Sequence, residues 1–462
     1  MGINYDAIVI GTGQAGPSLA DRLQREGLKV AIIERALVGG TCVNVGCTPT
    51  KTLVASAKAA YVARHARDFG VLIAGPVQTD MQLVKARKDR IVGESTRALT
   101  EWLEGMDNVD LVHGHARFTG PDAVEVNGQT LRADKIFIDV GARARVPDWP
   151  DLAAIPYFTN SSVMDVDYLP EHLIVIGGSY IGLEFAQMYR RFGSRVTVVE
   201  QGDRLIARDD PDISQAVQDI LEGEGVEFRL QAQCMTAAPH PAGVAVRVRC
   251  DEGPEEVIGS HLLLAIGRVP NTDDLGLDSA GIQTDKQGYI VVDEMLRTSA
   301  PNVWALGEVN GRGAFTHTSY NDYEIVVANL FDNDPRRVTD RILCYGLFID
   351  PPLGRVGMTE QEARKSRHSV LVGKRPMTRV SRAKEFGETR GFIKVLVDGD
   401  DGKILGAAIL GLHGDEVAHS LLDVMYANKP FTVIERAVHI HPTVTELIPT
   451  VLQDLTPSEQ LR

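Results

Sequence analysis

The chain has 462 residues, of which 44% are hydrophobic and 24% charged, and this length allows two to four domains with ample cores. A formal net charge of -14 disfavours a nucleic-acid partner, which would demand a basic face. The start lacks a basic stretch followed by a long apolar one, and no apolar run reaches about 18 residues. We therefore expect a cytoplasmic protein with no membrane partner.

The N-terminal segment is typical of a βαβ unit. An apolar strand is expected over Tyr5–Ile10, a glycine turn follows, and "VAIIER" supplies a second strand. The intervening helix carries apolar residues at four-residue spacing: Ala15, Leu19 and Leu23. Gly27 is suited to the C-terminal end of this helix.

The turn of this unit matches the G-x-G-x-x-G pattern at Gly11, Gly13 and Gly16. The first glycine permits the tight turn, the second lets the backbone approach a pyrophosphate, and the third brings helix against strand. Glu34 closes the second strand, where a carboxylate can accept hydrogen bonds from the hydroxyls of an adenosine ribose. We therefore expect a dinucleotide site here.

Two of the five cysteines, Cys42 and Cys47, follow this unit within "GGTCVNVGCTPTK". A zinc site would require further Cys or His at ligand spacing, and the other three cysteines stand singly along the chain. Inert core thiols are the second alternative. A loop eased by Gly46 can bring the two sulfurs to disulfide geometry, so a redox pair is favoured and no metal ligands are expected.

A second βαβ unit is expected in "LIVIGGSYIGLEFAQMYRRFGSRVTVVE". Its expected elements are a strand over Leu173–Ile176, a helix from about Ile181 to Phe192, a stop at Gly193 and a strand over Val196–Val199. Two such units imply two dinucleotides. A flavin and a nicotinamide together could pass electrons on to a thiol pair.

The glycine motif of the second unit departs from the pattern at one position. Gly177 and Gly182 occupy the outer positions, and Ser179 stands where the middle glycine is expected. Serine is small enough to permit close approach with some loss of clearance. We therefore expect the second site to bind a dinucleotide as well.

The nicotinamide preference rests on the residue that ends the second unit. Glu200 would accept hydrogen bonds from the adenosine ribose hydroxyls and repel a 2′-phosphate, which favours NADH over NADPH. Arg204 and Arg208 follow within a few residues and would favour NADPH if the loop folds back to form a phosphate clamp.

The stretch Gly39–Lys51 matches the motif G-G-T-C-x-N-x-G-C-x-P-[ST]-K throughout. On this motif and the two nucleotide units, the chain resembles the class I pyridine nucleotide-disulfide oxidoreductases over nearly its whole length. That family includes glutathione reductase, lipoamide dehydrogenase, soluble transhydrogenase and mercuric reductase. The resemblance implies FAD, a nicotinamide nucleotide and a homodimer.

The resemblance also implies roles for individual residues of the redox site. Cys47 would be the thiol beside the flavin ring, and Cys42 the interchange thiol that faces substrate. Lys51 resembles the lysine near flavin N5, and its partner carboxylate maps to Glu184 in "IGLE". Tyr180 maps to the aromatic gate over the nicotinamide pocket.

The fold implied by the resemblance is α/β, with two Rossmann-like dinucleotide-binding domains and a C-terminal α+β dimerisation domain. "GARARVP" resembles the linker that leaves the first FAD segment, and "AIGRVPNT" resembles the return into it. The expected segments are 1–150 and 268–339 for the FAD-binding domain, 151–267 for the NAD(P)H-binding domain and 340–462 for the dimerisation domain.

Further cofactor-binding residues follow from the resemblance. They are Gly40, Thr41, Ala116, Gly141, Ile181, Gly267, Arg268, Phe315 and Thr316. Glu308 stands where the family has an aspartate that holds the ribityl chain of the flavin. A carboxylate is retained there but is one methylene longer.

Near the end of the chain, "HIHPTVTELIP" resembles the family motif H-P-T-x-x-E. His441 would be the general acid/base, and Glu446 the carboxylate that orients it. We expect this histidine to reach the thiols of the other subunit in a twofold-symmetric homodimer.

These inferences predict an oxidoreductase that passes electrons from nicotinamide through FAD to the Cys42–Cys47 disulfide and then to a small disulfide substrate. Within the enzyme class, alternatives are a copper- or mercuric-type metal-ion reductase and dihydrolipoamide dehydrogenase. Mercury is disfavoured because the ending "TPSEQLR" lacks a cysteine pair. A non-catalytic flavin-binding sensor is the alternative from a different class.

Overall fold

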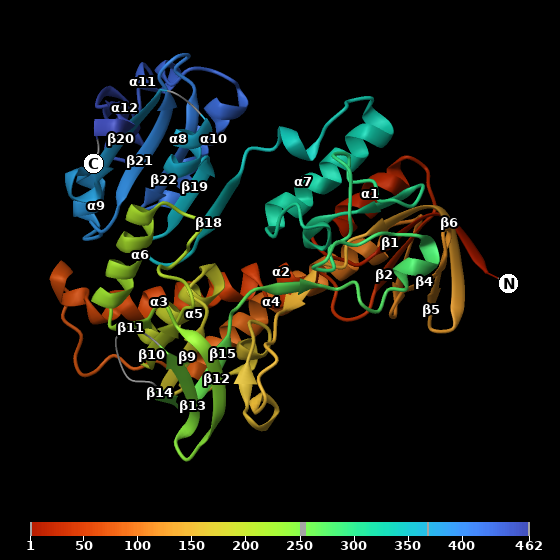
Figure 1. Cartoon of the computed structure of the whole chain (residues 1–462), viewed down its shortest axis with the longest axis horizontal. Coiled ribbons are helices and arrows are strands. Elements are labelled where there is room, and N and C mark those ends of the chain that lie inside the picture. The colour runs from red at the N-terminus through yellow and green to blue at the C-terminus, as the bar shows by residue number, and fades with distance from the viewer. Residues whose placement is uncertain (1, 250–255, 367–368, 461–462) are drawn as a thin grey trace.

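A computed structural model describes residues 2–249, 256–366 and 369–460, and these residues form five β-sheets (Figure 1). Three of the sheets are the centres of separate lobes. The first lies near the N-terminus, the second contains the middle of the chain, and the third lies near the C-terminus. The architecture is the expected α/β fold of two nucleotide-binding lobes and a C-terminal lobe.

The first lobe contains a seven-stranded sheet in the order β3-β2-β1-β6-β5-β4, with β17 beside β6. Its strands are β1 (Ile3–Ile10), β2 (Val30–Glu34), β3 (Val109–His113), β4 (Arg117–Gly120), β5 (Ala123–Val126), β6 (Gln129–Ile138) and β17 (Val303–Ala305). Pairing is parallel between β1 and both neighbours, between β2 and β3, and between β6 and β17. The chain therefore leaves this sheet after β6 and returns to it at β17.

Local sequence explains the first βαβ unit. The predicted strand, helix and second strand are confirmed as β1, α1 (Gly16–Arg25) and β2. Leu19 and Leu23 of α1 are fully buried, as the four-residue spacing predicts. Gly27 lies just beyond the helix with φ of +83°, a backbone conformation that favours glycine.

The second lobe is centred on a parallel sheet in the order β11-β10-β9-β15-β8. Its strands are β8 (Tyr157–Phe158), β9 (His172–Ile176), β10 (Arg195–Val199), β11 (Val226–Arg229) and β15 (His261–Leu264). The helices α5 (Tyr180–Phe192) and α6 (Pro211–Gly223) follow β9 and β10, and a three-stranded sheet contains β12 (Gln233–His240), β13 (Gly243–Arg249) and β14 (Glu256–Gly259). The second predicted βαβ unit is thereby confirmed as β9, α5 and β10.

The two passages between the first and second lobes lie side by side. β7 (Ala142–Ala144) leads out of the first lobe, and β16 (Arg268–Pro270) leads back into it. They pair antiparallel, with Arg268 opposite Ala144. Both passages lie in the sequences that were expected to mark the linkers.

The third lobe is an antiparallel sheet in the order β18-β19-β22-β21-β20-β23. Its strands are β18 (Cys344–Leu347), β19 (Leu353–Gly357), β20 (Val370–Pro376), β21 (Phe392–Asp398), β22 (Ile404–Leu410) and β23 (Thr456–Pro457). Its helices are α8 (Glu360–Ser366), α9 (Ser381–Glu385), α10 (Gly414–Tyr426), α11 (Thr432–Glu435) and α12 (Ile448–Gln453). Every residue of β21 and β22 is buried, so side chains from both faces of the sheet form the core.

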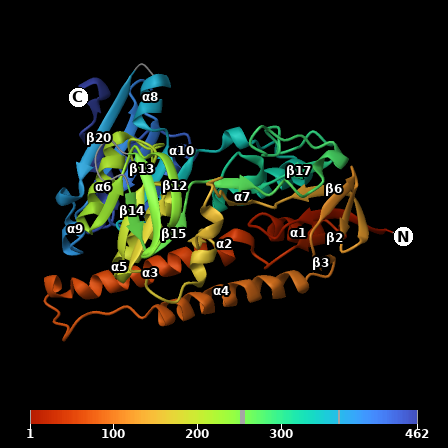
Figure 2. The same cartoon turned by 60° about the horizontal axis from the view of Figure 1, so that its bottom comes forward.

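Three further helices connect the lobes: α2 (Gly40–Asn44), α3 (Cys47–Arg64) and α4 (Met81–Glu104). Figure 2 shows α3 and α4 as long helices along one side of the molecule. Helix α3 packs against α5 of the second lobe and against α4. Within the three described ranges, no helix combines the length and the apolar character needed to cross a bilayer.

Candidate active site

A cavity of about 2190 Å³ is lined by residues of all three lobes. Most of the expected site residues line it: Gly11, Gly13, Glu34, Gly40, Thr41, Cys42, Cys47, Lys51, Ala116, Gly141, Ser179, Tyr180, Ile181, Glu184, Gly267, Arg268, Glu308, Phe315 and Thr316. The expected residues that do not line it are Gly16, Gly177, Gly182, Glu200, His441 and Glu446. The structure therefore brings the first nucleotide motif, the cysteine pair and Tyr180 to one cavity.

The glycines of the first motif are required by close backbone packing. A side chain at Gly11, where φ is +105°, would place Cβ 2.2 Å from the carbonyl oxygen of Asp139. A Cβ at Gly13 would lie 2.8 Å from the Asp139 carboxylate, and one at Gly16 would lie 2.4 Å from the carbonyl oxygen of Gly11. The turn therefore packs closely on Asp139, and its first two glycines line the cavity without side chains, as a pyrophosphate site requires.

The carboxylates that end the two nucleotide units are held in the same way. Glu34 accepts hydrogen bonds from the backbone N–H of Thr12 at 3.1 Å and of Ala36 at 2.8 Å. Glu200 accepts from the backbone N–H of Gly178 at 2.5 Å and of Gly202 at 2.7 Å. The second unit therefore repeats the contacts of the first at equivalent positions.

The serine in the second motif causes no backbone strain. Ser179 is exposed and has φ of -107° and ψ of -173°, an extended conformation that any residue adopts. The outer glycines are more constrained, because a Cβ at Gly182 would lie 2.0 Å from the carbonyl oxygen of Gly177. Glycine is thus needed at the outer positions and dispensable at the middle one.

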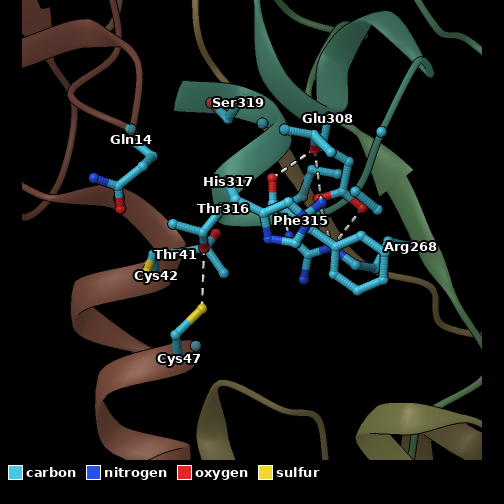
Figure 3. A pocket seen from close by; sticks show the side chains of 18 of the residues that line it. Gln14, Thr41, Cys42, Cys47, Arg268, Glu308, Phe315, Thr316, His317 and Ser319 are labelled. Atoms are coloured by element: carbon cyan, nitrogen blue, oxygen red, sulfur yellow. Dashed lines mark hydrogen bonds and ion pairs between the residues drawn. The ribbon is translucent and has the colours of Figure 1, made fainter. Parts of the chain in front are cut away.

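The two cysteines stand on either side of a break between helices. Cys42 belongs to α2 and Cys47 is the first residue of α3, and both are free thiols. Gly46 makes the break with φ of -128° and ψ of -117°, and a Cβ there would lie 2.7 Å from the carbonyl oxygen of Thr41. Figure 3 shows both cysteine side chains beside the cavity.

The surroundings of Cys47 favour a thiolate. Its pKa is lowered to about 6, chiefly because the Cys42 thiol donates a hydrogen bond to it, with further help from the Thr316 hydroxyl and the charge of Lys51. The Thr316 Oγ1 atom lies 3.1 Å from the Cys47 sulfur. The same hydrogen bond, together with burial, raises the pKa of Cys42. At neutral pH the pair therefore holds one proton, on Cys42.

Lys51 and Glu184 connect α3 to α5. The Lys51 Nζ atom lies 2.7 Å from Oε2 of Glu184, whose side chain is only 6% exposed. The other carboxylate oxygen accepts a hydrogen bond from the backbone N–H of Phe348 at 2.9 Å. Both oxygens are thus engaged, which fixes Lys51 one helical turn from Cys47.

Glu308 has a partner that the sequence did not indicate. The Arg268 Nε atom donates a forked hydrogen bond to its two carboxylate oxygens, at 2.8 and 2.9 Å (Figure 3). Burial raises the pKa of Glu308, and Arg268 opposes that rise. Glu308 therefore links the turn after β17 to β16. The expected contact with a ribityl chain stays a prediction.

His441 and Glu446 form the expected pair but lie apart from the cavity. The His441 Nδ1 atom is 2.9 Å from a carboxylate oxygen of Glu446. The histidine side chain is 74% exposed within the single chain, whereas that of Glu446 is 15% exposed. Such an oriented and exposed imidazole is free to meet another surface.

Sequence reasoning missed several side chains of the cavity region. The Thr12 hydroxyl donates to Glu34 at 2.6 Å and accepts from the Gly39 N–H at 3.1 Å. Asp139 follows β6, accepts a hydrogen bond from the Gly16 N–H at 2.8 Å, and has a pKa raised by complete burial. Its place after a buried strand adjoining β1 is a signal that could have indicated it. Asp209, which accepts hydrogen bonds from the hydroxyls of Tyr180 and Tyr345, has no comparable signal in the sequence.

Comparisons with known proteins agree with this geometry. A model of the pyridine nucleotide-disulphide oxidoreductases matches residues 5–322, and a model of the dimerisation domain of the same proteins matches residues 344–452. The chain belongs to this family. It is 35% identical to the probable pyridine nucleotide-disulfide oxidoreductase RclA of Escherichia coli, over 96% of this chain and 97% of that protein.

Other relatives within the family have different named activities. Dihydrolipoyl dehydrogenase of Thermus scotoductus is 33% identical over 96% of this chain and 95% of its own length. Mercuric reductase of Streptomyces lividans is 31% identical over 98% of this chain and 96% of its own length. Two structures of the HOCl-induced flavoprotein disulfide reductase RclA, one a Cu(II) complex, have TM-scores of 0.89 at 34% identity over 97% of this chain and 99% or more of theirs.

Membership of the pyridine nucleotide-disulphide oxidoreductases makes the chain an enzyme of FAD-dependent NAD(P)H disulfide oxidoreduction. FAD and a nicotinamide nucleotide are its cofactors, and the dimerisation domain supports a homodimer. The residues present fit a flavin dinucleotide. Gly11 and Gly13 of the turn line the cavity without side chains, so a pyrophosphate can approach the backbone there, and the Glu34 carboxylate lines the same cavity.

Proposed function

We propose that Cys42 and Cys47 form the redox centre of this enzyme and that a small disulfide is its substrate. The observation that carries the proposal is the position of the two thiols on either side of a helix break, in a cavity that the first nucleotide motif also lines. The pKa of Cys47 there is lowered to about 6, chiefly by a hydrogen bond from Cys42. Disulfide exchange requires a thiolate and a second thiol that can resolve the mixed disulfide.

FAD, when bound, supplies a relay for two electrons between the nicotinamide and the disulfide. We assign its pyrophosphate to the Gly11–Gly16 turn, its adenosine ribose to Glu34 and its ring to the neighbourhood of Cys47 and Lys51. Glu308 is the proposed ribityl contact. The FAD-binding domain would then comprise residues 1–150 and 268–339, around a nucleotide domain of 151–267 and ahead of a dimerisation domain of 340–462.

The chain's own residues suffice for the thiol chemistry. His441 of the partner subunit takes the proton of Cys42, and the resulting thiolate attacks one sulfur of the substrate disulfide. The substrate S–S bond breaks, and the departing thiolate takes the proton back from the imidazole. Cys47 thiolate then attacks the Cys42 sulfur, which re-forms the internal disulfide and releases the second product as a thiolate that takes its proton from water. The dithiol gives up two electrons, and the substrate gains them.

NADH is the proposed electron donor. Both carboxylate oxygens of Glu200 are held by the backbone N–H groups of Gly178 and Gly202, so the charge is fixed at the end of β10. A fixed carboxylate at this position accepts hydrogen bonds from the ribose hydroxyls and repels a 2′-phosphate. Arg204 donates instead to the carbonyl oxygen of Ala207 at 3.0 Å, which occupies one of its nitrogens.

A second candidate substrate is a thiol-seeking metal ion. RclA, which is 34% identical to this chain, has been solved as a Cu(II) complex, and mercuric reductases are also among the relatives. A dithiol with one thiolate could donate electrons to Cu(II) from the same place.

We place the protein in the cytoplasm, where thiols are kept reduced.

The test is an anaerobic assay of the purified holoenzyme with NADH and a panel of oxidised glutathione, lipoamide, cystine and Cu(II). We expect turnover of at least one disulfide, abolished in both Cys42→Ser and Cys47→Ser. Turnover of Cu(II) alone would move the assignment to metal reduction. Turnover of a disulfide that survives both substitutions would contradict the proposed redox centre.

A further inference from the structure

Tyr180 stands between the second nucleotide motif and the cysteine pair. It is the first residue of α5, and Glu184 lies one turn further along the same helix. Glu184 binds Lys51, which lies one turn from Cys47 on α3. Tyr180 therefore lines the cavity between the second nucleotide motif and the cysteine pair.

Aromatic rings surround Tyr180 on the cavity side. Its ring meets Phe315 edge-on at 6.3 Å and Tyr345 at 5.3 Å. Phe315 and Tyr345 are themselves stacked at 5.5 Å, and Phe315 precedes Thr316, the hydrogen-bond partner of Cys47. Tyr180, Phe315 and Tyr345 all line the cavity that Ser179 of the second motif also lines. If a nicotinamide ring enters from that motif, the Tyr180 ring is the one it meets.

The hydroxyl of Tyr180 is held by a buried carboxylate. It donates to Oδ2 of Asp209 at 3.0 Å, and the hydroxyl of Tyr345 donates to Oδ1 at 3.1 Å. The Asp209 side chain has no exposed surface, and its counter-charge is Arg355, itself 1% exposed, at 3.6 Å. A hydrogen bond to a charged acceptor buried in this way is stronger than one between neutral groups.

We propose that Asp209 is a positioning residue that latches Tyr180 in the closed position. The inference rests on the proposed function, because it assumes that nicotinamide binds at the second motif. Opening the latch exchanges the Tyr180–Asp209 bond for a hydrogen bond to water, and that loss opposes nicotinamide binding. The latch therefore sets the affinity for the nucleotide and leaves the rate of the later steps unchanged.

The two tyrosines that share Asp209 provide a matched pair of variants. Tyr180→Phe removes the latch hydroxyl, keeps the ring and leaves the Asp209–Arg355 pair in place. Tyr345→Phe removes the other hydroxyl from the same carboxylate but leaves Tyr180 latched. Asp209→Asn, alone and combined with Tyr180→Phe, tests whether Asp209 acts through Tyr180.

The measurement is anaerobic stopped-flow reduction of the holoenzyme flavin over a range of NADH and NADPH concentrations, with calorimetric binding of NAD⁺ and NADP⁺ as a second readout. We expect Tyr180→Phe to lower the dissociation constant about tenfold, with the limiting rate within about twofold of wild type. Tyr345→Phe should change the constant by less than about twofold. Asp209→Asn should tighten binding in the wild-type background and have no further effect beside Tyr180→Phe.

Equal dissociation constants for Tyr180→Phe, Tyr345→Phe and wild type would overturn the latch and leave the proposed function intact. Weaker binding by Tyr180→Phe would also overturn it. If neither nucleotide reduces the wild-type flavin, the proposed function fails and the latch fails with it. Should Asp209→Asn not fold, the comparison of the two tyrosine variants alone decides.

Discussion

Lys51 and Glu184 form an ion pair, with 2.7 Å between Nζ and Oε2, that joins the helix of the cysteine pair to the first helix of the second nucleotide unit. Glu184 is nearly buried, and its second oxygen is bound by the backbone N–H of Phe348. The lysine charge is thereby held near the Cys47 sulfur. One contact thus positions α3 against α5 and tunes the thiol.

Replacement of Lys51 by methionine should raise the pKa of Cys47, because the lysine charge lowers it in the native protein. Lys58→Met on the same helix is the matched control, since Lys58 pairs with Asp350 and is not among the main causes of the Cys47 pKa shift. The measurement is the rate of alkylation of Cys47 against pH in the reduced protein, read by peptide mass spectrometry. Coincident profiles for the two lysine variants would refute the role of Lys51.

The pH profile of Cys47 itself should have its midpoint near pH 6. A lowered pKa means that the thiolate is present above about pH 6, so alkylation should fall as the pH drops through that value, whereas in urea the midpoint should move up to about 8.5. The stability linked to this thiol is present above the unfolded pKa and is lost as the pH falls through the folded one.

The donor to the Cys47 thiolate can be removed or retained. Cys42→Ala removes the hydrogen bond that contributes most to the lowered pKa, so the Cys47 midpoint should move up. Cys42→Ser keeps a hydroxyl donor at the same place and should stay close to wild type. If both variants have the wild-type midpoint, the shared proton is not the cause of the low pKa.

Short-range patterns in the sequence predicted the two βαβ units, because glycine spacing and apolar periodicity act within a few residues. The contacts that the sequence did not indicate join distant segments. Glu308 and Arg268 are 40 positions apart, and Tyr180 and Asp209 are brought together only by the loop after β10. No motif in the sequence indicates either pairing. For Glu308, the resemblance to the family implied a different contact, with the ribityl chain of the flavin.

The Arg268–Glu308 pair should stabilise the first lobe. Each side chain is 15% exposed, so Glu308→Gln leaves a mostly buried guanidinium without its counter-charge. We expect a loss of about 1–3 kcal/mol, seen as a thermal midpoint about 2–6 °C lower and as easier loss of flavin on dialysis. Glu308→Asp keeps the charge and should lose less. Equal losses in the two variants would show that charge is not what Glu308 contributes.

His441 should serve the thiols of the other subunit. The test is a mixed dimer of one Cys42→Ser subunit and one His441→Ala subunit. If each site combines Cys42 of one subunit with His441 of the other, one site carries both substitutions and the other site carries neither. Loss of a positioned acid/base costs on the order of 10²- to 10⁴-fold, so restored turnover should be clear against both mutant homodimers. Co-expressed, doubly tagged heterodimers as inactive as their parents would refute the shared site.

The most direct test of the electron route is to count thiols after anaerobic reduction by NADH. The oxidised holoenzyme is treated with one equivalent of NADH per subunit, alkylated under native conditions and then in denaturant, and digested for mass spectrometry. The account predicts that Cys42 and Cys47 together become alkylated only in the NADH-treated sample, while Cys344, which also lines the cavity, reacts equally with and without NADH. A flavin reduced by NADH while Cys42 and Cys47 remain joined as a disulfide would contradict it.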